Sequence, residues 1–250
     1  MSGDIANARY SLLLTPDSSL LTPHSLALLF RMDRAILFDF NGVIVDDEPQ
    51  HCEALIATLA EYGIPLSRDD YYRDYLGFDD RECFRFAFER GRLRADDGVL
   101  DHAIERKATL YEKAIRQSMT LVPGSTDFIR DASRKGYRLA VVSGALRREI
   151  ELVLSLGGLR DLFGVVIASE DVNACKPDPQ GYERARETLA LPCERCVIIE
   201  DSLPGLGAAR RAGIRCAMVA TSHSVTDLRA ADLVWQDLRG HTADELPWSA

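Results

Sequence analysis

The chain has 250 residues, enough to bury one large domain or one domain that carries an insertion. Its 46% hydrophobic and 28% charged residues are ordinary values for a globular protein. Because 30 basic residues stand against 39 acidic ones, with a formal net charge of −9 and no long basic run, we expect a small-molecule partner and no nucleic acid.

The first 31 residues show neither helical nor strand periodicity. They contain two prolines, many Ser and Thr residues and a short internal repeat, LLTPDS followed by LLTPHS. Such a composition predicts a loose N-terminal extension over residues 1–31, and Met32 is an alternative start of translation.

From Arg34 onward, short apolar runs alternate with helical stretches. The runs cover residues 35–40, 138–144, 164–169, 196–201, 214–220 and 232–235. Continuous apolar runs of this length are typical of strands buried on both faces of a parallel sheet. The segments 124–136 and 145–158 have helical spacing and end at glycine. We therefore predict an α/β fold with a doubly wound parallel sheet, whose ligands bind at the carboxyl ends of the strands.

One interval, residues 48–117, contains amphipathic helical segments and no convincing strand. Because it follows the first strand, a helical module there would hang over the strand ends. We predict an all-helical cap over residues 48–117, inserted into an α/β core over residues 32–47 and 118–250.

Polar residues stand where the predicted strands end. Asp39 ends the first strand and Ser143 the second, Lys176 follows the third, and Glu200 and Asp201 end the fourth. Since the carboxyl ends of parallel strands share one edge of a sheet, these side chains should converge. An ionised Asp39 can attack phosphorus, and Lys176 can offset charge on the phosphoryl oxygens. The arrangement therefore indicates phosphoryl transfer, in which catalysis is mostly positioning and charge stabilisation.

The same edge offers groups for a metal ion and for phosphate. Asp39 and Asp201, with a backbone carbonyl, supply the oxygen ligands that Mg²⁺ prefers, so we predict Mg²⁺ as the cofactor. Ser143 and the N–H groups of Gly144 and Ala145, at a predicted helix start, can hold phosphoryl oxygens.

Between Arg34 and about Ala220 the chain resembles the haloacid dehalogenase superfamily. The resemblance is carried by four motifs in the family's order, DFNGVIVD, VVSGA, KPDP and EDSLPGLGAARRAGI. The helical module resembles the cap of the branch that contains phosphoglycolate phosphatase and β-phosphoglucomutase. The resemblance implies a Mg²⁺-dependent phosphatase that acts on a small phosphorylated metabolite through an aspartyl-phosphate.

Asn41 departs from the family pattern. Family members that hydrolyse phosphate esters carry an acid here, which protonates the leaving alkoxide and later deprotonates the attacking water. An amide does neither, although the backbone carbonyl of Asn41 stays a metal ligand by resemblance, beside Asp39, Asp201 and Glu200. Metal binding and nucleophilic attack should persist, whereas loss of a general acid–base typically costs about 10²- to 10⁴-fold.

Two segments of the helical module resemble parts of the family that contact substrate. DDEPQH is similar to an Asp-Ser-Glu-Pro segment, with Asp47 at the serine place and His51 where some members contact substrate. YLGFDDRECF is similar to the cap turn and makes Arg81 a candidate for gripping the distal end of the substrate. An exposed helix face is expected for three other basic residues, His102, Lys107 and Lys113.

Three functions stay open at this stage. The first is a phosphatase that is slow on alkyl esters but competent on acyl or aryl phosphates, with Asp47 or Glu48 as a substitute proton donor. The second is a non-catalytic protein that binds a phosphorylated metabolite. The third is a mutase similar to β-phosphoglucomutase, or a phosphonatase with Lys107 or Lys113 as the Schiff-base amine. Neither the substrate nor the oligomeric state follows from these residues.

The cysteines and the hydropathy bear on the cellular compartment, on zinc binding and on membrane association. Six cysteines are scattered along the chain without a secretory signal before them, so reduced thiols in a cytoplasmic protein are expected. Cys193 and Cys196 form a C-x-x-C pair, but two further ligands at zinc-site spacing are missing. No apolar run approaches the ~20 residues of a membrane span, so no membrane partner is expected.

Overall fold

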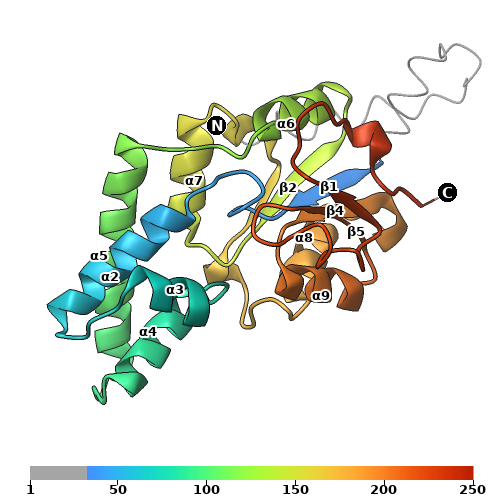
Figure 1. Ribbon diagram of the computed structural model, residues 1–250. Helices are drawn as coiled ribbons and strands as arrows, with labels where there is room; N and C mark the ends of the chain where they lie inside the picture. Colours follow the sequence, from blue (N-terminus) through green and yellow to red (C-terminus); the bar gives the residue numbers. More distant parts are fainter. Residues whose placement is uncertain (1–32, 250) are drawn as a thin grey trace, which may run out of the picture.

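A computed structural model describes residues 33–249 as a parallel sheet flanked by helices, with a further group of helices at one side (Figure 1). The six strands in this range are β1 (Ala35–Phe38), β2 (Arg138–Val142), β3 (Val165–Ile167), β4 (Cys196–Glu200), β5 (Arg215–Val219) and β6 (Leu233–Trp235). They run parallel in the order β3-β2-β1-β4-β5-β6. The predicted parallel sheet is confirmed, and the prediction for residues 1–31 lies outside the described residues.

Helices cover both faces of the sheet. They are α6 (Ser125–Arg134), α7 (Arg147–Leu156), α8 (Gln180–Thr188) and α9 (Leu203–Arg211). Ile36 and Phe38 of β1 pack with apolar residues of α6 and α7, whereas Ala35 and Leu37 pack with those of α8 and α9. Every residue of β1 is therefore buried, as expected for a central strand of a doubly wound sheet. Short 3₁₀ helices complete this part of the chain, at Arg160–Leu162, Ser169–Asp171, Cys193–Arg195 and Ala243–Glu245.

The strand register aligns the polar residues that follow the strands. Phe38 of β1 pairs with Val141 of β2 and with Ile199 of β4. Asp39 therefore stands level with the ends of both neighbouring strands. The backbone N–H of Asp39 donates to the Ile199 carbonyl at 2.9 Å, which extends the sheet by one residue at this edge.

Four helices lie between residues 48 and 117 and pack mainly on one another. They are α2 (Glu48–Glu61), α3 (Arg68–Asp74), α4 (Asp80–Arg90) and α5 (Asp97–Gln117). Most of their buried apolar side chains, including Leu55, Phe84 and Leu100, form a hydrophobic cluster of their own, whereas Tyr111 and Ile115 of α5 pack with the sheet. The starts of α3, α4 and α5 are fixed by N-cap residues, Ser67, Asp79 and Asp96, whose side chains accept a backbone N–H from the first turn.

Two neighbouring backbone segments connect these helices to the sheet. The N–H of Asp46 donates to the Thr120 carbonyl at 2.9 Å, and the N–H of Val122 donates to the Ile44 carbonyl at 3.0 Å. The chain thus leaves and re-enters the sheet region at one place, close to Asp39. Within the described range, no helix has both the length and the apolar character needed to cross a bilayer.

Candidate active site

Lys176 joins the ends of three strands. Its Nζ donates to Asp39 Oδ1 and to Glu200 Oε1, each at 2.6 Å, and to the backbone carbonyl of Val142 at 3.2 Å. Asp201 follows Glu200 directly and is also buried. The residues predicted from strand ends, Asp39, Lys176, Glu200 and Asp201, are therefore brought together at one edge of the sheet.

Three carboxylates crowd this edge. One oxygen from each of Asp39, Glu200 and Asp201 lies within 4.8 Å of the others. Burial and the neighbouring Glu200 raise the pKa of Asp39 to about 7, although Lys176 lowers it. Burial, Glu200 and Asp39 together raise the pKa of Asp201 well above its ordinary value. One ammonium does not balance three carboxylates, so the oxygen-rich donor set fits an additional divalent cation such as Mg²⁺.

Glu200 is held differently from the other two carboxylates. Its Oε1 accepts from Lys176 and from the Tyr182 hydroxyl at 2.9 Å. Its Oε2 accepts from the N–H groups of Asp201 and Ser202, each at 3.0 Å, and from the Ser202 hydroxyl at 2.9 Å. Although burial raises its pKa, Lys176 and these donors hold the pKa of Glu200 below its usual range. Both oxygens are thus engaged within the protein, and Glu200 serves to anchor Lys176.

The loop after β1 needs a glycine next to Asp201. Gly42 has a φ of +75°, and a Cβ at this position would lie 2.0 Å from Asp201 Oδ2. The Ser222 hydroxyl donates to the same Oδ2 of Asp201, and the Thr221 hydroxyl donates to the Gly42 carbonyl at 2.5 Å. Sequence reasoning missed Thr221 and Ser222. A signal was available, because they directly follow the fifth predicted strand, where site residues of a parallel sheet gather.

The predicted phosphate-binding turn after β2 is only partly available. Ser143, Gly144 and Ala145 all line the cavity at the sheet edge. However, the N–H of Ala145 donates to Ser143 Oγ at 3.0 Å and is not free, and α7 begins only at Arg147. The expectation of two free N–H groups at a helix start is therefore wrong for Ala145, because the serine hydroxyl closes the turn.

Asn41 turns its amide nitrogen away from Ser143. Nδ2 donates to both oxygens of Asp47, at 2.9 and 3.1 Å, while the Ser143 hydroxyl donates to Asn41 Oδ1 at 3.4 Å. Asp47 is fully buried and also accepts the Tyr111 hydroxyl. Although burial raises it, interactions with His51, Asn41 and Tyr111 hold the pKa of Asp47 below its usual range. An ionised Asp47 has no proton to give, so this geometry does not favour it as the substitute donor.

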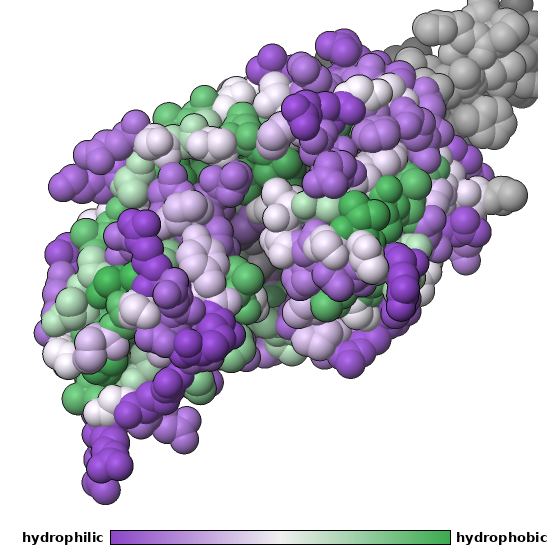
Figure 2. Space-filling model, in the orientation of Figure 1, coloured by the Kyte–Doolittle hydropathy of each residue, from purple (hydrophilic) through white to green (hydrophobic). Residues whose placement is uncertain are grey.

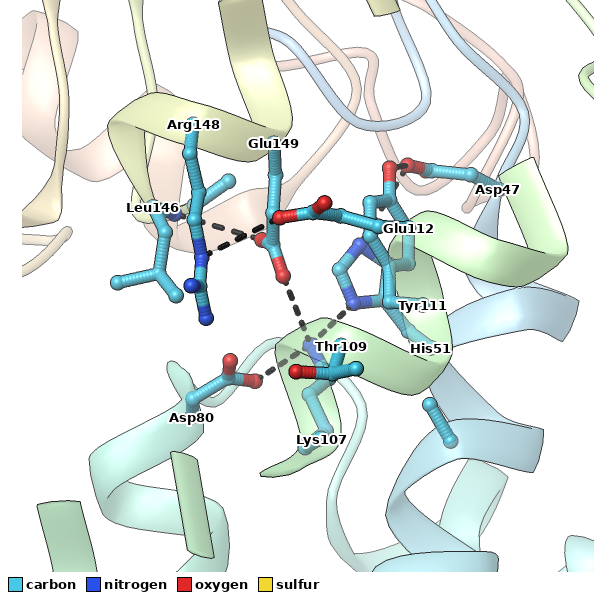
Figure 3. A network of polar contacts seen from close by, with 12 residues as sticks. Asp47, His51, Asp80, Lys107, Thr109, Tyr111, Glu112, Leu146, Arg148 and Glu149 are labelled. Carbon is cyan, nitrogen blue, oxygen red and sulfur yellow. Dashed lines mark hydrogen bonds and ion pairs between the residues drawn. The ribbon is translucent and has the colours of Figure 1, made fainter. Parts of the chain in front are cut away.

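Lys107 lies at the centre of a second buried network (Figure 3). Its Nζ is 2.6 Å from His51 Nδ1, 2.7 Å from Asp80 Oδ1 and 3.9 Å from Glu149 Oε1. The network therefore joins α5 to α2, to α4 and to α7. The expectation that Lys107 lies on an exposed helix face is wrong, since only 2% of the side chain is exposed.

The helical period of α5 carried a signal for this burial. Leu100, Ala103, Lys107 and Tyr111 follow one another at intervals of three or four residues and are all buried, so Lys107 belongs to the apolar stripe. The other two basic residues, His102 and Lys113, are exposed as expected.

The two predicted substrate contacts on the helical module have protein partners. His51 stacks on Tyr111 at 4.2 Å between ring centroids, and its ring nitrogens approach Lys107 and the Asn41 amide. Arg81 pairs with Asp101 and, at 3.5 Å, with Asp97 on the surface of the helices. His51 lines the cavity, whereas Arg81 is absent from its described lining.

The cavity links the sheet edge to the helical module. It has a volume of about 560 Å³ and is lined by Asp39, Asn41, Lys176 and Asp201 on the sheet side. A carboxylate that could attack phosphorus, a fixed ammonium and an acidic cluster that could hold a cation therefore share one solvent-accessible space, the combination that phosphoryl transfer needs.

Comparison with known proteins agrees with this geometry. The sequence matches the haloacid dehalogenase-like hydrolase family over residues 36–219. It is 28% identical over 207 residues to validoxylamine A 7'-phosphate phosphatase of Streptomyces hygroscopicus subsp. limoneus, covering 83% of this chain and 95% of that protein. It is 35% identical over 195 residues to the protein CbbY of Cereibacter sphaeroides, covering 74% of this chain and 83% of that protein.

A solved structure shows the same fold. An Asp-to-Asn variant of CbbY from Rhodobacter sphaeroides, in complex with xylulose-(1,5)bisphosphate, has a TM-score of 0.78 and 28% identity, and covers 85% of this chain and 98% of that chain. Protein SUPPRESSOR OF QUENCHING 1, chloroplastic, of Arabidopsis thaliana is 28% identical over 200 residues, which are 79% of this chain but only 19% of that protein. The family match spans most of the described residues, from β1 to β5, and the chain therefore belongs to the haloacid dehalogenase-like hydrolase family.

Proposed function

We propose that the chain is a Mg²⁺-dependent phosphatase that hydrolyses a small phosphorylated metabolite through an aspartyl-phosphate on Asp39. The observation that carries this proposal is the contact of Lys176 with Asp39 at 2.6 Å, beside the buried Asp201. Relatives named as phosphatases of phosphorylated metabolites give further support. The free thiols of the described cysteines are compatible with the proposed cytoplasmic location.

The side chains can carry the phosphoryl transfer in two steps. An oxygen of Asp39 attacks phosphorus, the bond from phosphorus to the ester oxygen breaks, and the leaving group takes its proton from solvent. Water then attacks the same phosphorus, breaks its bond to Asp39 and releases inorganic phosphate. Throughout, Lys176 offsets charge on the phosphoryl oxygens and the Ser143 hydroxyl can donate to one of them.

Asp39, Asp201 and the backbone carbonyl of Asn41 are the groups that would hold Mg²⁺. The bound ion would neutralise the crowded carboxylates and polarise the phosphoryl group. Glu200 is proposed as the anchor of Lys176, since both its oxygens are already engaged.

Asn41 sets the proposed range of substrates. The amide supplies no proton to an alkoxide, so aryl and acyl phosphates, whose leaving groups need little protonation, should react better than alkyl phosphates. We also propose that α2 to α5 act as a cap over the cavity, because their side chains line it opposite the sheet edge.

Lys107 argues against a phosphonatase that uses it as the Schiff-base amine. Although burial lowers it, Asp80 and Glu149 raise the pKa of Lys107 above its ordinary value. A protonated ammonium is not a nucleophile, so Lys107 fits a structural role better than covalent catalysis.

The test is an assay of purified protein with p-nitrophenyl phosphate and with an alkyl phosphate, each with Mg²⁺ and with excess EDTA. We expect Mg²⁺-dependent turnover that Asp39→Asn abolishes and that the control Asp161→Asn, a remote exposed acid, leaves unchanged. If the parent protein and Asp39→Asn are equally inert while inorganic phosphate still binds, the protein is a non-catalytic phosphate binder and the proposal is wrong.

A further inference from the structure

The cap side of the cavity presents apolar side chains. Tyr72, Leu76 and Phe78 line it and are exposed at 44%, 42% and 44% of their surface, large values for such residues. Leu55 and Tyr71 lie in the same wall but are buried. Figure 2 shows a recess between the helical module and the sheet, bordered by both hydrophobic and hydrophilic residues. Exposed apolar side chains gathered in one cavity commonly mark the place where a ligand is covered.

Most charged residues of the same wall are acidic, although Lys107 and His51 also line it. Asp46, Glu48, Asp79 and Asp80 line the cavity along the helical side. Among its described lining residues there is no arginine, although Arg is the residue that best matches phosphate or carboxylate groups in proteins.

The two lysines that line the cavity are already committed. Lys176 is paired with Asp39 and Glu200 at the phosphoryl end. Lys107 is paired with Asp80, and the His51 ring lies against its Nζ. Neither is available to neutralise a second phosphate at the distal end of a substrate. A second phosphate would instead lose its water beside carboxylates of the same charge. Contact between like charges strongly lowers binding affinity.

We propose that the substrate is a monophosphate ester whose leaving group is an uncharged aromatic or aliphatic body, without a second phosphate or carboxylate. This inference rests on the proposed phosphatase function. The phosphate lies at Asp39 and Lys176, and the rest of the molecule packs on Tyr72, Leu76 and Phe78. The chain thus differs in specificity from a relative such as the CbbY variant that binds xylulose-(1,5)bisphosphate.

Matched esters test this specificity. The substrates are phenylethyl phosphate, butyl phosphate and the bisphosphate with a phosphate at each end of the same butyl chain. We expect kcat/KM to fall in that order, with the bisphosphate about 10- to 100-fold below butyl phosphate. Equal or faster turnover of the bisphosphate would overturn the inference while leaving the phosphatase function intact.

A charge placed on the apolar wall should reverse the preference. Leu76→Arg should raise kcat/KM for the bisphosphate relative to butyl phosphate about 10-fold. Leu156→Arg is the matched control, because Leu156 is a similarly exposed leucine on α7 outside this cavity. If both variants change the ratio equally, the wall does not set specificity and the inference is wrong.

Binding separates failure of the inference from failure of the phosphatase function. Calorimetry with Asp39→Asn, which cannot accept the phosphoryl group, should give tighter binding for phenylethyl phosphate than for the bisphosphate. If the parent protein turns over neither p-nitrophenyl phosphate nor any of the three esters, the phosphatase function fails, and the same calorimetry on the parent protein decides the ligand class. Tighter binding of the bisphosphate contradicts the inference in either case.

Discussion

Two lysines, one half-buried and one buried, organise the molecule in different ways. Lys176, at the sheet edge, is in contact with Asp39 and Glu200 and still reaches the cavity with 19% of its side chain exposed. Lys107, among the helices, contacts His51 and Asp80 and is almost completely enclosed. Both are held charged by nearby carboxylates, which raise the pKa of each lysine although burial lowers it.

The difference lies in the balance of charge around each lysine. Around Lys176, a third buried carboxylate, Asp201, lies close and has its pKa raised well above normal by burial and by its acidic neighbours. Around Lys107, the His51 ring contributes a second basic group. Although burial and Lys107 lower it, Asp47 and Glu149 raise the pKa of His51 above its ordinary value. The three carboxylates around Lys176 therefore leave an excess of negative charge that an additional cation could offset, whereas the network around Lys107 is closer to balanced and joins elements of the fold.

The largest expected change is a gain of activity when a carboxylate is placed at position 41 and removed from position 47. Asn41→Asp alone would set two carboxylates against each other, since Asn41 Nδ2 lies 2.9 Å from Asp47, and such a pair does not ionise fully. Asn41→Asp combined with Asp47→Ser removes this conflict. We expect the double variant to raise kcat for alkyl phosphates by about 10²- to 10⁴-fold, and the single variant by less.

Steady-state kinetics on butyl phosphate measure this gain, with Asp47→Ser alone as the control that should bring none. If neither Asn41→Asp protein gains activity, proton transfer is not the deficit and the site is adapted to the amide.

Removing Lys107 should act mainly on stability. Lys107→Met leaves Asp80 and the buried Glu149 without their cation, and breaking a buried pair costs about 3–5 kcal/mol. Adding Glu149→Gln removes one stranded charge and should restore part of the loss. Chemical denaturation measures the free energy of unfolding, and Lys113→Met, at an exposed site on the same helix, should stay within about 0.5 kcal/mol of the parent. If Lys107→Met lost no more unfolding free energy than Lys113→Met, the proposed structural role of Lys107 would be contradicted.

Removing Lys176 should act mainly on turnover. Lys176→Met takes away the charge that faces the phosphoryl oxygens, a change worth about 10²- to 10³-fold in kcat. It also leaves Asp39, Glu200 and Asp201 with more uncompensated negative charge, so Mg²⁺ should raise the melting temperature of the variant more than that of the parent. Phosphatase assays and thermal melts with and without Mg²⁺ check both statements. An unchanged kcat would contradict the assignment of Lys176.

The strands and their polar ends were accessible from the sequence for one physical reason. A strand buried on both faces is apolar along its length, so the first charged residue after it, such as Asp39, or at its last position, such as Glu200, marks the carboxyl edge of the sheet. The short helix α3 is harder to recognise in the sequence, because Tyr71 is its only buried residue and the helix therefore shows no apolar period.

The contacts within the site were harder to predict. The N–H of Ala145 is taken by a serine two residues earlier, a local turn that residue types do not reveal. Lys107 was placed at the surface because lysine usually lies there, although its spacing from Leu100 and Tyr111 fits the buried stripe. The partners that keep it inside come from α2, α4 and α7, so only the packing of the helices identifies them.

The smallest expected effect comes from Arg148, which joins the same two helices as the pair of Lys107 with Glu149. Arg148 on α7 pairs with Glu105 at 2.6 Å and with Glu112 at 3.4 Å on α5, but its side chain is 37% exposed. Since water screens exposed pairs, Arg148→Ala should cost less than about 1 kcal/mol, and the cost should shrink as salt is added. Denaturation at low and high salt measures this, with the exposed Arg134→Ala as the control. If Arg148→Ala instead cost as much unfolding free energy as Lys107→Met, independently of salt, burial would not make the Lys107 contact to α7 stronger than the Arg148 contacts to α5.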